Sequence, residues 1–170
     1  MVSEGIWILA VFIMLERLIE LVIARRNQML ALAAGAKEYG AKHYPLFFLL
    51  HSGWLLGWIV EGHIRGRLSE LWYLWFGAYL LAQGLRYWCI TSLGTHWNTR
   101  ILVIPNGKNI RHGPYRYLKH PNYLAVAIEL ISVPMIFEAV ITALFATLAN
   151  AFLLLRIRIP TEEKALKLLK

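Results

Sequence analysis

One short polar stretch gathers residue types that can bind a small molecule. It reads Gly113-Pro-Tyr-Arg-Tyr-Leu-Lys-His-Pro-Asn-Tyr123. Pro121 disfavours helix at His120 and suits the first turn of the helix that follows, so we expect His120 near an N-cap. Free N–H groups there suit an anion, and the tyrosine rings can contact cations or stack on bases. A loop before a proline-started helix would explain the same residues without any ligand.

A second polar stretch lies near the C-terminus and reads Arg156-Ile-Arg-Ile-Pro-Thr-Glu-Glu-Lys-Ala-Leu166. Pro160 is expected to end the preceding helix. Thr161 can then cap a short tail helix whose first turn holds Glu162 and Glu163, where acidic residues suit the helix dipole. Taken alone, this is the pattern of a capped surface helix.

The elements around both stretches are long apolar runs. Hydrophobic residues make up 58% of the chain and charged residues 16%, against about 25% charged in soluble domains. We therefore expect an all-α integral membrane protein with about five transmembrane helices. The expected spans are residues 5–24, 44–60, 71–90, 122–137 and 139–155, followed by an amphipathic tail helix over 160–170.

The expected spans form one transmembrane domain over residues 1–170. Residues 1–92 supply a three-helix part, and residues 93–170 supply the motif region with a helical hairpin. Only Glu138 separates the two hairpin spans. The first of them is about 24 Å long at about 1.5 Å per residue, which leaves open whether it fully crosses a core of about 30 Å.

Basic residues predict the orientation of the spans. Fourteen Lys and Arg residues lie in the segments after the first span, after the third span and at the C-terminal end, whereas Arg65 and Arg67 lie on the other side. This bias predicts an outside N-terminus and a cytoplasmic C-terminus and site. The net charge of +8 therefore encodes topology, and no nucleic-acid partner is expected. Cys89 is the only cysteine, which excludes an internal disulfide and a CxxC metal site.

Several ionisable residues lie inside the expected spans, where they are costly unless they face partners or a cavity. Glu20 and Arg86 fall at similar depth on helices that run in the same direction, so we expect them to form a structural ion pair. Glu129 lies close to the His120 motif. Its position fits a structural partner and a cavity lining equally well.

Together the two polar stretches resemble one family. A Gly-x-Tyr segment leading to His-Pro-x-Tyr, then a hydrophobic hairpin, then Glu-Glu-x-x-Leu is similar to the isoprenylcysteine carboxyl methyltransferase family, over residues 93–166. The preceding Leu-Gly-Thr-His-Trp-Asn-Thr-Arg resembles a bacterial branch associated with O-methylation of alkylpyrones. The His-Pro-x-Tyr piece is also similar to membrane phospholipid methyltransferases. Gly107-Lys-Asn-Ile110 stands where eukaryotic members have His-x-Leu-Val.

The resemblance implies S-adenosyl-L-methionine as cofactor and no metal. Glu162 would hold the ribose hydroxyls or the methionine ammonium, and Arg158 would orient the substrate anion as the catalytic residue. The implied cofactor-binding residues are Gly107, Lys108, Asn109, Ile110, Tyr115, His120, Pro121, Asn122, Tyr123 and Glu162. Methyl transfer is then mainly a positioning task, and a carboxylate nucleophile, ionised at neutral pH, needs no general base.

The implied substrate is a lipophilic carboxylate or acidic enol that enters from the bilayer, with membrane lipids as surroundings. Two alternatives stay open. One is N-methylation of a phospholipid amine, for which Glu129 or Glu163 could handle the ammonium. The other is a non-catalytic membrane scaffold or small transporter, in which the polar motifs would be coincidental. The sequence specifies no oligomeric state.

Overall fold

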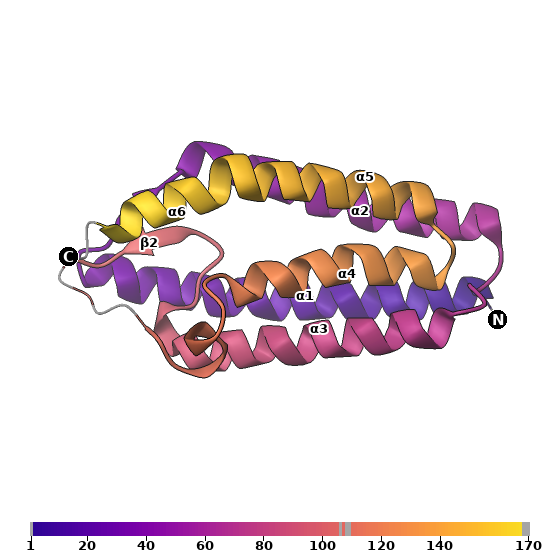
Figure 1. The fold of residues 1–170 in the computed structure, drawn as a ribbon, viewed down its shortest axis with the longest axis horizontal. Helices are drawn as coiled ribbons and strands as arrows, with labels where there is room; N and C mark the ends of the chain where they lie inside the picture. The colour runs from indigo at the N-terminus through magenta and orange to yellow at the C-terminus, as the bar shows by residue number, and fades with distance from the viewer. Residues whose placement is uncertain (1, 106, 108–109, 168–170) are drawn as a thin grey trace.

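The computed structural model describes residues 2–105, 107 and 110–167, which fold into an elongated bundle of helices (Figure 1). The helices run side by side along one long axis, with the two termini at opposite ends. The longer elements are α1 (Val2–Ala33), α2 (Tyr44–Arg65), α3 (Trp72–Leu93), α4 (Pro121–Ile136), α5 (Val140–Leu153) and α6 (Ile159–Leu166). The short helical turns are η1 (Ala41–His43), η2 (Gly94–His96), η3 (Gly113–Arg116) and η4 (Leu154–Arg158).

The predicted helical class is confirmed, but the expectation of an all-α chain is wrong in one detail. Strands β1 (Lys37–Tyr39) and β2 (Ile101–Val103) form a two-stranded antiparallel sheet in which Glu38 faces Leu102. Three residues per strand are too few to show an alternating pattern in the sequence. The sheet ties the loop after α1 to the loop after α3, beside α6 (Figure 1).

A test of length and composition bears on the five expected spans. Among the described residues, one continuous helical stretch, Val140–Leu166, is both long and apolar enough to cross a bilayer, and α4 is apolar but shorter. Helix α1 is long, yet it carries Glu16, Arg17 and Glu20 in its middle, and α2 and α3 are rich in Trp, Tyr and Gly. By this measure alone, therefore, five spans are not supported.

The end of α5 differs from the prediction, because Pro160 does not stop the helix. The chain passes through the π-helical turn η4 straight into α6. A wider π turn shifts the hydrogen-bond register, which accommodates the missing proline N–H in the first turn of α6. The Thr161 hydroxyl donates to the Ile157 carbonyl oxygen at 2.6 Å and forms no cap.

The hairpin between α4 and α5 is as tight as predicted. Glu138 adopts a left-handed conformation with φ of 52°, and its carboxylate accepts a hydrogen bond from Arg67 Nε at 2.7 Å. The Glu61 carboxylate of α2 accepts hydrogen bonds from the backbone N–H groups of Ile141 and Thr142, at 3.1 and 2.8 Å. These bonds fix the start of α5, so its far end returns to the level where α4 begins.

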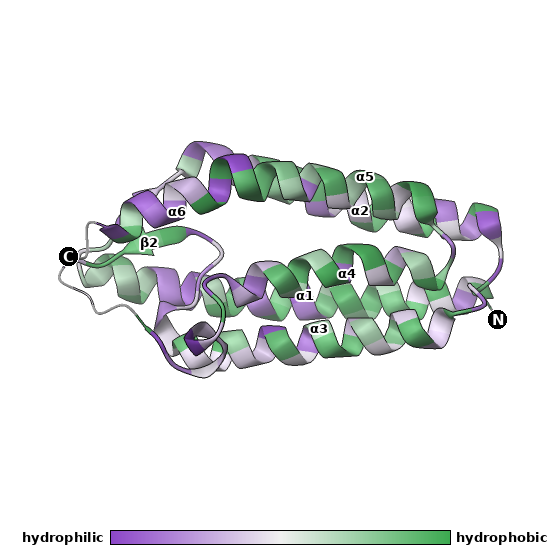
Figure 2. Cartoon of the chain, viewed as in Figure 1, coloured by the Kyte–Doolittle hydropathy of each residue, from purple (hydrophilic) through white to green (hydrophobic). Residues whose placement is uncertain are grey.

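The bundle is apolar outside and partly polar inside. Large apolar side chains lie exposed along α1, α2, α3 and α5, including Phe145 and Leu81 at 76% exposure each. Figure 2 shows apolar residues along most of the helix lengths. Among the described residues, the buried polar side chains are Glu16, Glu20, Asn27, Gln83, Arg86, Glu129, Ser132 and Asn150. Lipid-embedded bundles show this arrangement, because polar groups in hydrocarbon face partners inside the protein.

Candidate functional site

The two polar stretches identified in the sequence meet at one end of the bundle. The Tyr123 hydroxyl donates a hydrogen bond to the Glu162 carboxylate and accepts one from Arg158 Nε at 3.1 Å. The His120 ring stacks on Tyr123, with ring centroids 5.3 Å apart, and its Nδ1 lies 3.7 Å from Glu162 Oε1. We call His120, Tyr123, Arg158 and Glu162 the His120 cluster. It joins the start of α4 to the η4–α6 turn.

Local sequence features place His120 and its neighbours. His120 is the N-cap of α4, and Pro121 is buried in the first turn, as predicted. Gly113 has φ of +59°, and a Cβ there would lie 2.0 Å from the Ser92 hydroxyl oxygen, so only glycine lets η3 pack against α3. Tyr115 of η3 hydrogen-bonds the buried Cys89 thiol. The glycine of the Gly-x-Tyr pattern is therefore required for packing, and it positions the loop ahead of His120.

Arg158 is held in a fixed orientation by two bonds. Besides Nε, its Nη2 donates to the Thr99 carbonyl oxygen at 2.8 Å, and the guanidinium lies 5.9 Å from the Phe47 ring centroid. The Thr99 hydroxyl in turn lies 3.3 Å from the Tyr44 hydroxyl. Arg158 also lines a small depression with Gly40, His43, Phe47, Ile101, Ile157 and Thr161. Among the contacts that the structure describes, Arg158 Nη1 forms no hydrogen bond, so it remains available to bind a ligand.

The charges of the cluster are one carboxylate, that of Glu162, against the Arg158 guanidinium and the fraction of His120 that is protonated. The Glu162 carboxylate raises the pKa of His120 above its usual range against the opposing effect of burial, and Glu163, with Oε1 at 3.5 Å from His120 Nε2, adds to this rise. A histidine pKa lies near 6.5 in the absence of such partners, so a larger share of His120 carries its proton at neutral pH. Burial raises the pKa of the Tyr115 hydroxyl, which stays a neutral hydrogen-bonding group.

The remaining predicted cofactor residues are less closely tied to the cluster. Gly107 forms a turn in which its N–H donates to the Ile104 carbonyl at 3.0 Å, and Ile110 is half-buried. Lys108 and Asn109 lie outside the described residues. Asn122 is beside His120, and its Oδ1 is buried with no hydrogen-bond partner within the described part of the chain. That orphaned oxygen is an acceptor available for a ligand.

Sequence reasoning missed the residues that surround Arg158. Phe47 and Tyr44 belong to the first turn of α2, and Thr99 belongs to the loop before β2. Thr99 falls within the stretch that resembles the bacterial branch, which was a usable signal. In the sequence, Phe47 and Tyr44 indicate only the beginning of an apolar run. The packing of α2 beside α5 is what brings them close to Arg158 and Thr99.

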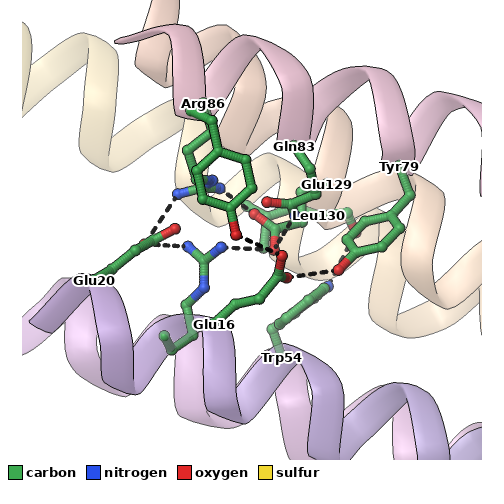
Figure 3. Close-up of polar contacts among 10 residues, drawn as sticks. Glu16, Glu20, Trp54, Tyr79, Gln83, Arg86, Glu129 and Leu130 are labelled. Carbon is green, nitrogen blue, oxygen red and sulfur yellow. Dashed lines mark hydrogen bonds and ion pairs between the residues drawn. The ribbon is translucent and has the colours of Figure 1, made fainter. Parts of the chain in front are cut away.

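A second group of polar side chains lies in the middle of the bundle (Figure 3). Arg86 forms its closest ion pair with Glu129 and lies 3.6 Å from Glu20. Arg17 Nη1 lies 2.8 Å from Glu20 Oε2, and Arg17 Nη2 lies 3.5 Å from Glu129 Oε1. The predicted Glu20–Arg86 pair therefore exists, but as the weaker part of a larger set. Glu129 is the centre of that set and a structural partner.

Tyrosine and glutamine side chains complete this group. Glu16 accepts hydrogen bonds from the Tyr79 hydroxyl at 2.7 Å and the Tyr87 hydroxyl at 3.0 Å, while Gln83 Nε2 donates to Glu129 at 3.3 Å. We call the set the central network. Its members are Glu16, Arg17 and Glu20 of α1, Tyr79, Gln83, Arg86 and Tyr87 of α3, and Glu129 of α4.

Comparison with known proteins identifies one family and two relatives of this chain. Residues 75–168 match the isoprenylcysteine carboxyl methyltransferase (ICMT) family. The chain is 36% identical over 162 residues to the uncharacterized protein YpbQ of Bacillus subtilis, covering 95% of this chain and 96% of that relative. It is 27% identical over 152 residues to an uncharacterized protein of Haemophilus influenzae, covering 88% of each. No solved structure gives a significant match.

The matched region contains α4, α5, α6 and the whole His120 cluster, and it covers more than half of the chain. The family match identifies a helical, membrane-associated protein of a methyltransferase class. The chain belongs to the isoprenylcysteine carboxyl methyltransferase family.

Proposed function

We propose that this protein is an S-adenosyl-L-methionine-dependent methyltransferase that O-methylates a carboxylate or acidic enol of a lipophilic substrate. The observation that supports this most strongly is the His120 cluster. Two stretches separated by the whole α4–α5 hairpin, both matching the family pattern, meet through Tyr123, which contacts both Arg158 and Glu162. A site that binds both the cofactor and the substrate requires the two stretches to come together in this way.

The residues present fit the proposed cofactor. The Glu162 carboxylate can accept hydrogen bonds from ribose hydroxyls or from the methionine ammonium. Asn122 offers a buried oxygen without a partner, and the stacked rings of His120 and Tyr123 offer an aromatic face. When bound, the cofactor supplies a methyl group on a sulfonium. His120, Asn122, Tyr123 and Glu162 would hold it at the start of α4.

Arg158 is the residue that we assign to the substrate. Its Nε and Nη2 are fixed by Tyr123 and Thr99, which holds the guanidinium plane against the cluster. Its charge can neutralise and orient an anion through Nη1. A carboxylate or acidic enol arrives largely ionised, so the protein has to align the nucleophile with the methyl group and needs no general base.

We further infer that the chain spans the membrane about five times, with α1 to α5 as spans. The exposed apolar faces of α1, α2 and α3 and the buried charges between them support this, although these helices are less apolar than α5. In this orientation the His120 cluster lies at the cytoplasmic end. An apolar tail could then reach Arg158 from lipid while the cofactor arrives from the cytoplasm.

Reporter fusions test this orientation. Fusion at the N-terminus is expected to report the outside, and fusion after Leu166 is expected to report the cytoplasm, because the basic segments cluster at the end that holds α6. A cytoplasmic N-terminus would show that the number of spans is wrong.

The structure favours O-methylation over phospholipid N-methylation in one respect. Glu129, a candidate for handling an ammonium, is committed to Arg86, Arg17 and Gln83 in the central network. Glu163 stays close to His120, but its side chain is half-exposed. The positive Arg158 beside the site suits an anionic substrate.

The reaction can be tested in membranes from cells that express the chain. With methyl-labelled cofactor, we expect label in an extracted lipophilic product that carries no amine. Mild alkali is expected to release the label from a methyl ester, whereas the methyl enol ether of an acidic enol keeps it. Membranes carrying Arg158→Ala serve as the matched control and are expected to show little label. Label in a product that resists alkali and carries an amine would favour phospholipid N-methylation, and no label above that in membranes from cells without the chain would contradict a methyltransferase.

A further inference from the structure

The charges of the central network do not balance. It holds the carboxylates of Glu16, Glu20 and Glu129 but only the guanidiniums of Arg17 and Arg86. Glu16, Glu20 and Glu129 are 6%, 5% and 4% exposed, so water screens the excess negative charge poorly. An uncompensated charge at such a depth is costly unless a proton or another cation neutralises it.

Unpartnered atoms show that the polar groups of the network are not all satisfied. Within the part of the chain that the structure describes, Glu20 Oε1 and Gln83 Oε1 are buried acceptors with no hydrogen-bond donor, and Arg17 Nε, Arg17 Nη2 and Arg86 Nε are buried donors with no hydrogen-bond acceptor. Gln83 is 6% exposed and lies in the network itself, as Figure 3 shows. A buried acceptor without a donor costs about 1–3 kcal/mol, and more when it is charged. A proton on a carboxylate removes its charge, and with it the part of the cost that comes from burying that charge without compensation.

The contacts distinguish the three carboxylates. Glu129 is held as an anion by Arg86, Arg17 and the Gln83 amide. Glu16 accepts one phenolic hydrogen bond on each oxygen, which suits an anion. Glu20 differs, because only its Oε2 has partners, and both of these are guanidiniums that it shares with Glu129.

We propose that the central network is a proton-binding site in which Glu20 carries a proton on Oε1 at neutral pH. The charges that remain, those of Glu16 and Glu129 against Arg17 and Arg86, then balance. The groups that face Glu20 are Glu16 and Arg17 from α1, Arg86 from α3 and Glu129 from α4. From α2, His51 interacts with Glu129, Arg86 and Arg17, and it is the competing place for a proton. This site is separate from the His120 cluster and does not depend on methyl transfer.

The proton links α1 to the rest of the bundle. When it leaves, the network regains a net negative charge between α1, α3 and α4, and these helices repel one another. The folded protein would then bind a proton at neutral pH that the unfolded chain does not, because an ordinary glutamate is ionised there. By linkage, this contribution to stability falls as pH rises. If Glu20 were ionised in the fold, its contribution would instead fall as pH decreases.

Infrared spectroscopy of the purified protein in detergent tests the proton directly. At neutral pH the wild type is expected to show the carbonyl stretch of a buried protonated carboxyl, shifted in heavy water, and Glu20→Gln is expected to lack it. Glu138→Gln, which removes a carboxyl at the surface, serves as the control and keeps the band. Absence of the band in the wild type, or its survival in Glu20→Gln, would overturn the proposal.

Thermal unfolding as a function of pH gives an independent test. Glu20→Gln, which resembles the protonated side chain, is expected to stay folded and to lose the part of the alkaline decline in Tm that the network causes. Glu129→Gln is expected to lower Tm at every pH, because it removes the shared anion. Should Glu20→Gln keep the wild-type decline while His51→Gln loses it, the proton sits on His51 and the assignment to Glu20 is wrong.

Discussion

Replacing Arg86 by methionine is expected to cost about 3 kcal/mol or more of folding free energy. Arg86 is 3% exposed and forms the closest ion pair of Glu129 while also facing Glu20. Its loss leaves buried carboxylates with Arg17 alone, in surroundings that water does not screen. We expect a large drop in Tm and in yield of folded protein, measured by thermal unfolding in detergent.

A double-mutant cycle separates this effect from simple loss of packing. Arg86→Met combined with Glu129→Leu is expected to recover much of the loss, because apolar residues often replace a buried ion pair at little cost. Arg67→Met is the matched control. It breaks the Arg67–Glu138 pair at the surface, which is expected to be worth about 0–1 kcal/mol. Additive effects of the two network changes would contradict a direct coupling.

Arg158→Ala is expected to abolish most turnover while leaving affinity for S-adenosyl-L-methionine nearly unchanged. The loss of a charge-assisted hydrogen bond costs about 1.5–3 kcal/mol, which is about tenfold to more than hundredfold in rate or affinity. Arg158→Lys should recover only part of the turnover, because lysine lacks the planar fork that reaches Tyr123 and Thr99.

The assay pairs methyl transfer to lipid extract with calorimetric titration of the cofactor. A fall in cofactor affinity as large as the fall in turnover would show that Arg158 belongs to the cofactor site. Full activity of Arg158→Ala would remove Arg158 from the chemistry altogether.

The helices and the hairpin could be predicted because long apolar runs and a proline-started turn at Pro121 are strong local signals. The meeting of His120 with Glu162 also followed, since a tight hairpin must bring its two open ends together. These inferences needed only lengths and boundaries. They required no knowledge of how each helix is rotated about its axis.

The remaining features depended on information that a sequence does not display. Matched depth indicated Glu20 as the partner of Arg86, but only the rotation of α4 brings Glu129 still closer. Pro160 predicted the end of a helix, but the helix continues through the π turn η4 into α6. Phe47 approaches Arg158 because α2 packs beside α5, a contact between segments more than a hundred residues apart.

The central claim is that Glu162 helps to hold the cofactor in a site shared by the start of α4 and the η4–α6 turn. Calorimetric titration of the purified chain with S-adenosyl-L-methionine tests it most directly, with Glu163→Ala as the control because it removes the same charge one residue away, where the side chain is half-exposed. We predict binding by the wild type, little change in Glu163→Ala, and an affinity about tenfold to more than hundredfold weaker in Glu162→Ala. Binding by Glu162→Ala as tight as that of the wild type would contradict the account.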